Sequence, residues 1–300
     1  MTPPHDWLGS LLASAAPQPA SARVRAPLSY LTPSSAKPFS YAHEPPPGVP
    51  WESGEHEQVW TDIRDARLHG GSFSIDAEGF VLLDSPTEVS DFTDDEQVRR
   101  VYHPEAEAIA LHVTGGQRAF VFDHLVRRRE RDRAPLTFGK RSAEGVAATN
   151  GRVHNDYTEA SGLKRLSMVL PDAPSHGRIR RHCIVNIWRS IRSPVLDTPL
   201  AVCDARSVSP TDLVCSEVRY PRRTGEIYAV THAPGHQWFF YPEMDRHEAL
   251  VFKQFDSATQ GVARFVPHAA FDLPHVPADA PLRESIELRC LVIYEEGSQP

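Results

Sequence analysis

The sequence predicts a mainly β fold with flanking helices, built around a double-stranded β-helix, or jelly-roll. From about residue 150 onward, short apolar runs alternate with turn residues at fairly even spacing. No long helical pattern separates these runs, and seven or eight strands without crossover helices are typical of a jelly-roll or barrel. The jelly-roll core is therefore expected over about residues 135–295.

The chain is long for one domain, but its 300 residues and 40% hydrophobic content allow a single large barrel with insertions. Residues 1–57 are rich in Pro, Ala and Ser, which predicts an extended arm that wraps the surface. More regular structure begins near Trp60, so residues 58–300 are expected to form one domain.

Two further segments precede the predicted core. Residues 73–76 and 79–83 suggest a hairpin whose turn spans residues 76–79. Residues 93–131 look helical, with Thr93 as an N-cap, a break at Gly115-Gly116 and a short buried strand at 119–122. The basic run Arg127-Arg128-Arg129 with Arg131 is balanced by Glu130 and Asp132, which favours a solvated helix face.

Within the core, seven apolar runs are expected to be strands. They cover residues 184–188, 200–204, 226–231, 237–241, 249–256, 264–266 and 285–294.

Charge and cysteine content exclude several classes of function. The formal net charge is −7 and the isoelectric point is near 6.1, so no nucleic-acid partner is expected. No apolar stretch approaches the ~20 residues of a membrane span. The four widely spaced cysteines form no C-x-x-C and predict free thiols in a reducing cytoplasm; they are Cys183, Cys203, Cys215 and Cys290. A homodimer is compatible with the sequence.

His154 and Asp156 form an H-x-D pair on a predicted strand. Because side chains two residues apart share a face, the imidazole and the carboxylate lie side by side, and Asn155 faces the other way. This pair alone is common by chance. Two histidines and one carboxylate with open positions make the facial triad of a non-haem Fe(II) oxygenase, so a second histidine is required.

His268 is the best candidate for that second histidine, because Arg283-x-Ser285 follows it after fourteen residues. His268 would lie on the penultimate strand and Arg283 would open the last one, on an adjacent antiparallel strand. A guanidinium binds a carboxylate with two hydrogen bonds, and a serine hydroxyl adds one more. The composite pattern predicts Fe(II) on His154, Asp156 and His268, with 2-oxoglutarate on Arg283 and Ser285.

Other histidines compete for the ligand position on spacing alone. His236 precedes an aromatic run, and His247 lies among charged residues that suggest an exposed turn. Neither is followed by R-x-S at the same interval. His182 and His232 are expected to pack without a catalytic role.

Several residues of the predicted strands are candidate contacts to 2-oxoglutarate or substrate. Asn186 and Trp188 share a strand face and Arg189 takes the other, and a buried Asn requires hydrogen-bond partners. The remaining candidates are Tyr228, Trp238 and Arg289. Core packing is an equal explanation for most of this set. Lys253 lies mid-strand and would pair with Asp256 or Glu287, or reach the co-substrate.

Six motifs together resemble one known family, the CmcJ/AsaB/NvfI-like hydroxylase/desaturase proteins of secondary metabolism. They lie at residues 153–158, 186–189, 199–205, 252–257, 267–271 and 283–289, and the similarity runs from about Phe39 to Tyr294. The resemblance implies an Fe(II)- and 2-oxoglutarate-dependent enzyme on a double-stranded β-helix. It also implies that His154, Asp156 and His268 are ligands and that Arg283 anchors the co-substrate.

The predicted function is therefore oxidation of an unactivated C–H bond of a small molecule with O2, by hydroxylation, desaturation or oxidative cyclisation. The chemistry is iron-centred, and no separate acid or base is predicted. One alternative is an iron oxidase of the same fold that does not use 2-oxoglutarate. A second is a non-catalytic binding or accessory protein on a cupin-like barrel, and a third is a zinc hydrolase.

Overall fold

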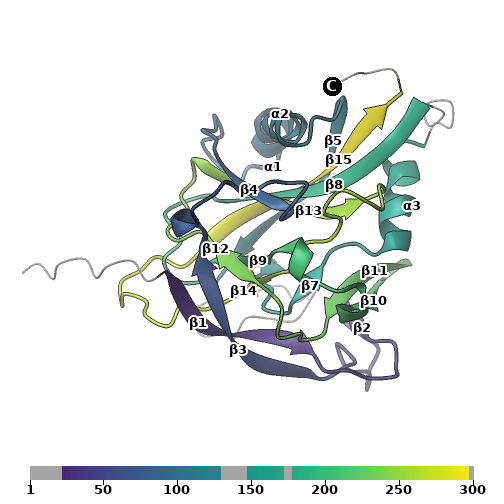
Figure 1. Ribbon diagram of the computed structural model, residues 1–300, viewed down its shortest axis with the longest axis vertical. Coiled ribbons are helices and arrows are strands. Elements are labelled where there is room, and N and C mark those ends of the chain that lie inside the picture. Colours follow the sequence, from purple (N-terminus) through teal and green to yellow (C-terminus); the bar gives the residue numbers. More distant parts are fainter. Residues whose placement is uncertain (1–21, 130–146, 172–177, 297–300) are drawn as a thin grey trace, which may run out of the picture.

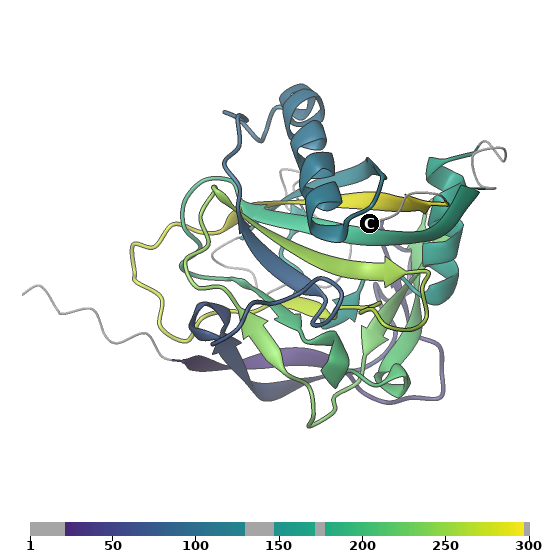
Figure 2. The same ribbon diagram turned by 45° about the horizontal axis from the view of Figure 1, so that its top comes forward.

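Two curled β-sheets face each other and form the jelly-roll that the sequence predicts (Figures 1 and 2). The structure, a computed structural model, describes residues 22–129, 147–171 and 178–296. Within these ranges, no helix is both long and apolar enough to cross a membrane.

The larger sheet has nine strands in the order β1-β3-β12-β9-β14-β7-β11-β10-β2. Strand β7, which begins at the first predicted ligand, and β14, which begins at His268, are neighbours in this sheet. The bounds are β1 (Arg23–Leu31), β2 (Phe39–Tyr41), β3 (His56–Asp65), β7 (His154–Asn155), β9 (Leu200–Cys203), β10 (Leu213–Tyr220), β11 (Arg223–Val230), β12 (Trp238–Phe240) and β14 (His268–Ala270).

The smaller sheet has six strands in the order β4-β13-β8-β15-β5-β6. Its long central strands, β8 and β15, pair antiparallel along their whole length, and they carry most of the predicted co-substrate residues. The bounds are β4 (Phe80–Asp84), β5 (Arg118–Arg128), β6 (Ala147–Ala148), β8 (Ile179–Ser190), β13 (Glu248–Asp256) and β15 (Glu284–Glu295).

Helices cover the outside of the sheets (Figure 2). Helix α2 (His103–Thr114) packs on the outer face of the smaller sheet, after α1 (Asp95–Gln97) and the π-helical turn η2 (Val98–Tyr102). Helix α3 (Glu159–Val169) starts at Thr158, whose hydroxyl accepts from the backbone N–H of Ser161. Three short 3-10 turns complete the set: η1 (Ala66–Leu68), η4 (Ala205–Ser207) and η5 (Pro210–Asp212).

An apolar cluster fills the space between the two sheets. Phe80, Leu250 and Phe252 project into it from the smaller sheet, and Val202 and Phe239 from the larger one. Burial of such side chains is the main favourable term in folding, at roughly 25 cal/mol per Å² of apolar surface. The packed interior gives the strands that carry the predicted site a rigid frame.

The segment expected to be a surface arm is instead part of the larger sheet. Ala26, Leu28 and Tyr30 alternate along β1 and are buried, and β1 pairs with β3 over its whole length. Proline is tolerated here because β1 lies at the edge of the sheet, where Pro27 needs no second partner strand. Residues 1–21 of the expected arm lie outside the described residues.

The hairpin expected at residues 73–83 does not form, because only its second strand, β4, exists. The chain turns over residues 75–78 instead, closed by a hydrogen bond from the Gly79 N–H to the Ser74 carbonyl oxygen (2.9 Å). Gly79 has φ +91°, and a Cβ at this position would lie 2.4 Å from Val266. Glycine therefore allows the turn to pack against the segment before His268.

Within residues 93–131, the helix before Gly115, the break at Gly115-Gly116 and the strand at 119–122 are confirmed. The N-cap of the first turn is Asp94 and not Thr93. Gly115, with φ +68°, ends α2, and the chain then enters β5. Arg127 and Arg128 therefore lie on a strand and not on a solvated helix face, while Arg131 lies outside the described residues.

Of the seven core strands expected, six form, and residues 264–266 do not. The backbone N–H of Val266 is bound by the Asn155 side chain and the Lys253 carbonyl oxygen, which replaces a regular strand ladder.

Candidate metal and co-substrate site

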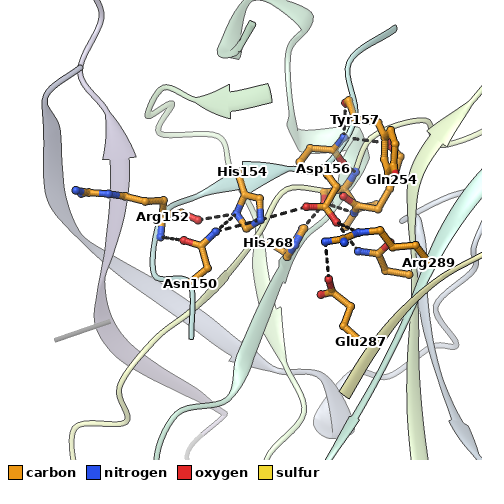
Figure 3. A network of polar contacts seen from close by, with 12 residues as sticks. Asn150, Arg152, His154, Asp156, Tyr157, Gln254, His268, Glu287 and Arg289 are labelled. Carbon is orange, nitrogen blue, oxygen red and sulfur yellow. Dashed lines mark hydrogen bonds and ion pairs between the residues drawn. The ribbon is translucent and has the colours of Figure 1, made fainter. Parts of the chain in front are cut away.

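The three predicted metal ligands lie together inside the barrel (Figure 3). His154, Asp156 and His268 are buried, and one ligand atom from each lies within 4.8 Å of the others. His154 and His268 are directly paired across β7 and β14, with ring centroids 4.2 Å apart. Nε2 of His154 lies 3.5 Å from Oδ1 of Asp156. Among the described residues, this is the one cluster of at least three His, Cys, Asp or Glu side chains that could hold a metal.

Backbone carbonyl groups orient both imidazoles. Nδ1 of His154 donates to the Arg152 carbonyl oxygen (2.8 Å), and Nδ1 of His268 donates to that of Val266 (3.3 Å). Each bond places the proton on Nδ1 and leaves Nε2 to offer its lone pair, which is the usual arrangement around a metal-binding histidine. Nε2 of His154 also lies 3.3 Å from Nδ2 of Asn150. Burial, reinforced by the neighbouring imidazole, lowers the pKa of His268 to about 3. Its ring is therefore neutral, as metal binding requires.

The two oxygens of the Asp156 carboxylate have different surroundings. Oδ2 accepts from Nδ2 of Asn186 (2.8 Å) and from Nε of Arg289 (2.9 Å), whereas Oδ1 faces His154. Burial favours the neutral acid, but Arg289 and the two histidines hold the pKa of Asp156 well below its usual range. Asp156 therefore offers Oδ1 as an anionic ligand.

Asn155, between the two ligands of the H-x-D pair, faces the other way as predicted. Its Nδ2 donates to the carbonyl oxygens of Tyr157 (2.7 Å) and Gln254 (2.9 Å), and its Oδ1 accepts from the N–H of Val266 (3.1 Å). The Gln254 side chain accepts from the backbone N–H of Asp156 (2.7 Å). Asn155 thus ties the strand of the first two ligands to the segment that leads to the third.

Arg283 is buried immediately before β15. Its Nη1 donates to the Thr198 carbonyl oxygen (2.8 Å), and its guanidinium carbon lies 5.3 Å from the centre of the Trp188 ring. The expected adjacency of the last two strands is wrong, because β14 belongs to the larger sheet and β15 to the smaller one. His268 and Arg283 therefore come from opposite sheets. Burial and the nearby Arg127 lower the pKa of Arg283 to about 9, although the carboxylates of Asp197 and Glu287 oppose this shift.

Four buried polar atoms of the predicted co-substrate residues have no hydrogen-bond partner among the residues that the structure describes. They are Nε of Arg283, Oγ of Ser285, Nε1 of Trp188 and Oδ1 of Asn186. An unpartnered buried polar group costs about 1–3 kcal/mol, so such a cluster indicates a polar ligand. Three of these four atoms belong to groups that donate hydrogen bonds, and a bound carboxylate would accept them. The neighbouring set of two histidines and one carboxylate is the ligand set of non-haem Fe(II). The residues present therefore fit both Fe(II) and 2-oxoglutarate.

Arg289 does not serve as a free co-substrate cation, contrary to expectation. Besides Asp156, it donates to Asp123 through Nη1 (2.7 Å) and to Glu287 through Nη2 (3.0 Å). Burial raises the pKa of Glu287, although Arg289 opposes this shift. The sequence did not single out Asp123, Glu287 or the nearby Arg127 as site residues. Side chains two residues apart on a strand share a face, so the sequence itself indicates that Glu287 lies beside Arg289. Asp123 and Arg127 could not be found in this way, because the segment that contains them was not expected to be a strand next to β15.

Three other candidate contacts lie away from the site. Arg189 is on the outer face of β8, where its Nε donates to the hydroxyl of Tyr102 (2.7 Å) beneath the helical layer. Tyr228 accepts from the backbone N–H of Glu159 at the start of α3 (3.3 Å) and packs on Phe265. Both predictions of a site contact are wrong, since these side chains face out of the barrel interior.

Trp238 also faces away from the ligands. In the register of the larger sheet, Phe239 pairs with Val202, which pairs with His268, so Phe239 and not Trp238 shares the ligand face. The indole N–H of Trp238 donates to the hydroxyl of Tyr30 (2.7 Å) on the other side of the sheet.

Lys253 and His236 have contacts outside the site. Lys253 pairs with Asp256 (2.8 Å) and Asp76 (2.5 Å), as one of its predicted alternatives proposed. His236 lies between the hydroxyl of Tyr30 (3.1 Å) and the carboxylate of Asp212 (3.2 Å).

Comparison with known proteins gives a consistent result. A family model described as an oxidoreductase/YMDC permease-like domain matches residues 28–293. Hydroxylase/desaturase efuI of Hormonema carpetanum is 33% identical over 256 residues, which are 78% of this chain and 83% of that protein. The α-ketoglutarate-dependent dioxygenase phiK of a fungal species is 32% identical over 238 residues, 77% of this chain and 83% of that protein.

The fold has a close counterpart among solved structures. The iron and α-ketoglutarate-dependent endoperoxidase NvfI superposes with a TM-score of 0.79 at 23% identity, over 92% of this chain and 99% of that one. Because the family model and both relatives span most of the sequence, the chain belongs to the hydroxylase/desaturase family of Fe(II)/2-oxoglutarate-dependent oxygenases.

Proposed function

We propose that this chain oxidises an unactivated C–H bond of a small molecule, with Fe(II) on His154, Asp156 and His268 and 2-oxoglutarate on Arg283 and Ser285. One observation carries the proposal. A buried two-histidine, one-carboxylate cluster lies beside buried polar atoms that have no partner in the described part of the chain. The family supports the same reaction class.

The protein's part in this reaction is to bind, orient and exclude water. Fe(II) with 2-oxoglutarate and O2 supplies the oxidising power for C–H cleavage. Nε2 of each histidine and Oδ1 of Asp156 would hold the metal. Nε of Arg283 and Oγ of Ser285 would donate to a carboxylate of the co-substrate, with the indole N–H of Trp188 within the same group of unpartnered donors. No side chain is assigned as a separate acid or base.

The proposal covers hydroxylation, desaturation and oxidative cyclisation of a secondary metabolite. Relatives carry the names hydroxylase/desaturase and aspirochlorine biosynthesis protein N, and the solved counterpart is titled an endoperoxidase. This range of names supports a common oxidising centre with different substrates.

Co-substrate binding gives the sharpest test. We expect Arg283→Gln to weaken binding of 2-oxoglutarate at least tenfold while leaving Mn(II) affinity unchanged, because it removes the charged anchor and no metal ligand. Binding of each would be measured by anaerobic titration calorimetry. Arg189→Gln is the matched control, since it removes a buried arginine from the outer face of β8.

Two outcomes would count against the proposal. Oxidation of a substrate, followed as O2 consumption, that proceeds without 2-oxoglutarate or that survives Arg283→Gln at full rate would favour an iron oxidase without this co-substrate. A purified chain that binds neither Fe(II) nor Mn(II), although His154 and His268 are intact, would exclude the enzyme.

We also propose a cytoplasmic protein that acts on small molecules and not on nucleic acid. Its four cysteines are free, and three of them are buried, which suits a reducing compartment. The net charge of −7 opposes binding to a phosphate backbone. Co-fractionation with a cytosolic marker, and absence of DNA retardation at low salt, are the expected results.

A further inference from the structure

The carboxylate of Asp156 is held by two side chains that face each other across one strand pair. Asn186 on β8 is the register partner of Arg289 on β15, and both donate to Oδ2. The three side chains approach from the smaller sheet and from the end of β7. Oδ2 therefore has two donors at 2.8 and 2.9 Å, whereas Oδ1 has only the imidazole of His154 at 3.5 Å.

Arg289 is itself braced by two further carboxylates. Its Nη1 donates to Asp123 on the neighbouring strand β5. Its Nη2 donates to Glu287, two residues earlier on β15 (Figure 3). The side chain of Arg289 is 15% exposed, and those of Glu287 and Asp156 are 6% and 5% exposed. Each of the three guanidinium nitrogens thus has one carboxylate partner. These bonds restrict rotation of the Arg289 side chain away from Asp156.

We propose that Arg289, braced by Glu287 and Asp123, is a positioning residue that restricts Asp156 to coordination through Oδ1 alone. The inference rests on the proposed function, because it concerns the metal site assigned there. A carboxylate can bind a metal through one oxygen or through both. Occupation of Oδ2 by Arg289 removes the second mode.

The number of open positions explains why this matters. Three single-atom protein ligands leave three positions of an octahedron, which suffice for a two-point co-substrate and one oxygen molecule. If Asp156 bound through both oxygens, only two positions would stay open. Arg289 therefore keeps the third of these positions open.

Arginine suits this role better than the asparagine at position 186, which binds the same oxygen, and better than a lysine would. The amide of Asn186 is neutral, whereas a hydrogen bond between ions is about twice as strong. A lysine offers a single ammonium, which could not hold three carboxylates in a fixed plane.

The test compares Arg289→Gln with Arg189→Gln, using Mn(II) alone as the probe. Both variants remove a buried arginine from neighbouring strands, but only the first touches Asp156. We expect Arg289→Gln to weaken Mn(II) binding by about 10–100-fold, as is typical when a partner of a metal ligand is removed. Arg189→Gln should change the dissociation constant less than about threefold, whatever it does to stability.

A spectroscopic measurement separates positioning from a general loss of structure. At saturating Fe(II) without oxygen, bound 2-oxoglutarate gives a visible charge-transfer band. We expect the band to be lost or shifted in Arg289→Gln, although Arg283 is intact. Arg289→Lys, which keeps the charge, should restore less than half of the intensity, and the urea midpoints of both variants would show whether they remain folded.

The outcomes distinguish this inference from the function on which it rests. Mn(II) binding within threefold of the unaltered chain, with an unchanged band, would overturn the positioning role and leave the oxygenase assignment standing. Failure of the unaltered chain to bind Mn(II) would overturn both. Full recovery of the charge-transfer band with Arg289→Lys would show that a positive charge suffices. It would contradict the proposal that the three hydrogen-bonded nitrogens of Arg289 are required.

Discussion

The side chain of Asn155 is not a candidate metal ligand, yet its hydrogen bonds fix the backbone segments that carry the candidate ligands. It is fully buried and joins three segments through the Tyr157 and Gln254 carbonyl oxygens and the Val266 N–H. The H-x-D pattern therefore carries information in its middle position as well as at its ends.

We expect Asn155→Ala to lower the free energy of unfolding by at least about 2 kcal/mol, since it leaves several buried backbone groups without partners. Urea unfolding of the metal-free protein would measure the change. Gln58→Ala, at an exposed position, is the control. A loss below about 0.5 kcal/mol would mean that water or neighbouring groups replace these bonds.

The sequence predicted that His154, Asp156 and His268 lie together, because their pattern is local and chemically specific. His154 and Asp156 are two residues apart, and the interval from His268 to Arg283 adds the co-substrate anchor. By contrast, Asp123 and Glu287 contribute through Arg289, and that contact depends on the register between β5 and β15. Register is a property of paired strands, so a single sequence does not contain it.

At the scale of the element, α3 is fitted closely against the smaller sheet. Gly162 is buried in this helix, and a Cβ at its position would lie 2.3 Å from the ring of Phe255, which is fully buried. The helix thus approaches the sheet at a distance that only glycine permits.

Gly162→Ala should destabilise the protein by about 1–3 kcal/mol through overpacking. The sign is informative, because alanine in a helix interior is otherwise favoured over glycine by about 1 kcal/mol. Ser167→Ala, on the exposed face of α3, is the control and should be neutral or stabilising. An increase in melting temperature for Gly162→Ala would show that Phe255 can move aside.

Elements were predicted well where one chemical signal was dominant. The strongly apolar runs became β8, β13 and β15. β1 and β3 were missed because charged and proline residues occupy their exposed face. The break at Gly115-Gly116 was predicted correctly, because a left-handed glycine closes α2. The basic residues Arg127 and Arg128 were wrongly expected on a helix, because their charge hid the continuation of β5.

At the scale of the whole molecule, the stability of the metal-free protein should depend on pH through histidines that are neutral when folded. Burial lowers the pKa of His56 and of His103 to about 4, from about 6.5 in an unfolded chain. Between these values the unfolded chain binds protons that the folded chain does not. The free energy of unfolding should therefore fall as the pH decreases from about 6.5 towards 4.

The urea midpoint at pH 7 and at pH 5 would test this expectation. His103→Gln should reduce the difference between the two, because it removes one of the titrating groups. His247→Gln, at the surface, controls for the loss of a histidine as such. If His103→Gln leaves the pH dependence unchanged, the ring of His103 is accessible to protons in the folded protein.

The pairing of β7 with β14 has a consequence for how the protein acquires its metal. His268 lies far along the chain from His154 and Asp156 and meets them only when β7 and β14 pair. Contacts between residues so distant in sequence form slowly, so the proposed triad is expected to be completed late in folding. A misassembled barrel would present at most two of the three proposed ligands, so iron would be held tightly only by molecules whose barrel is already closed.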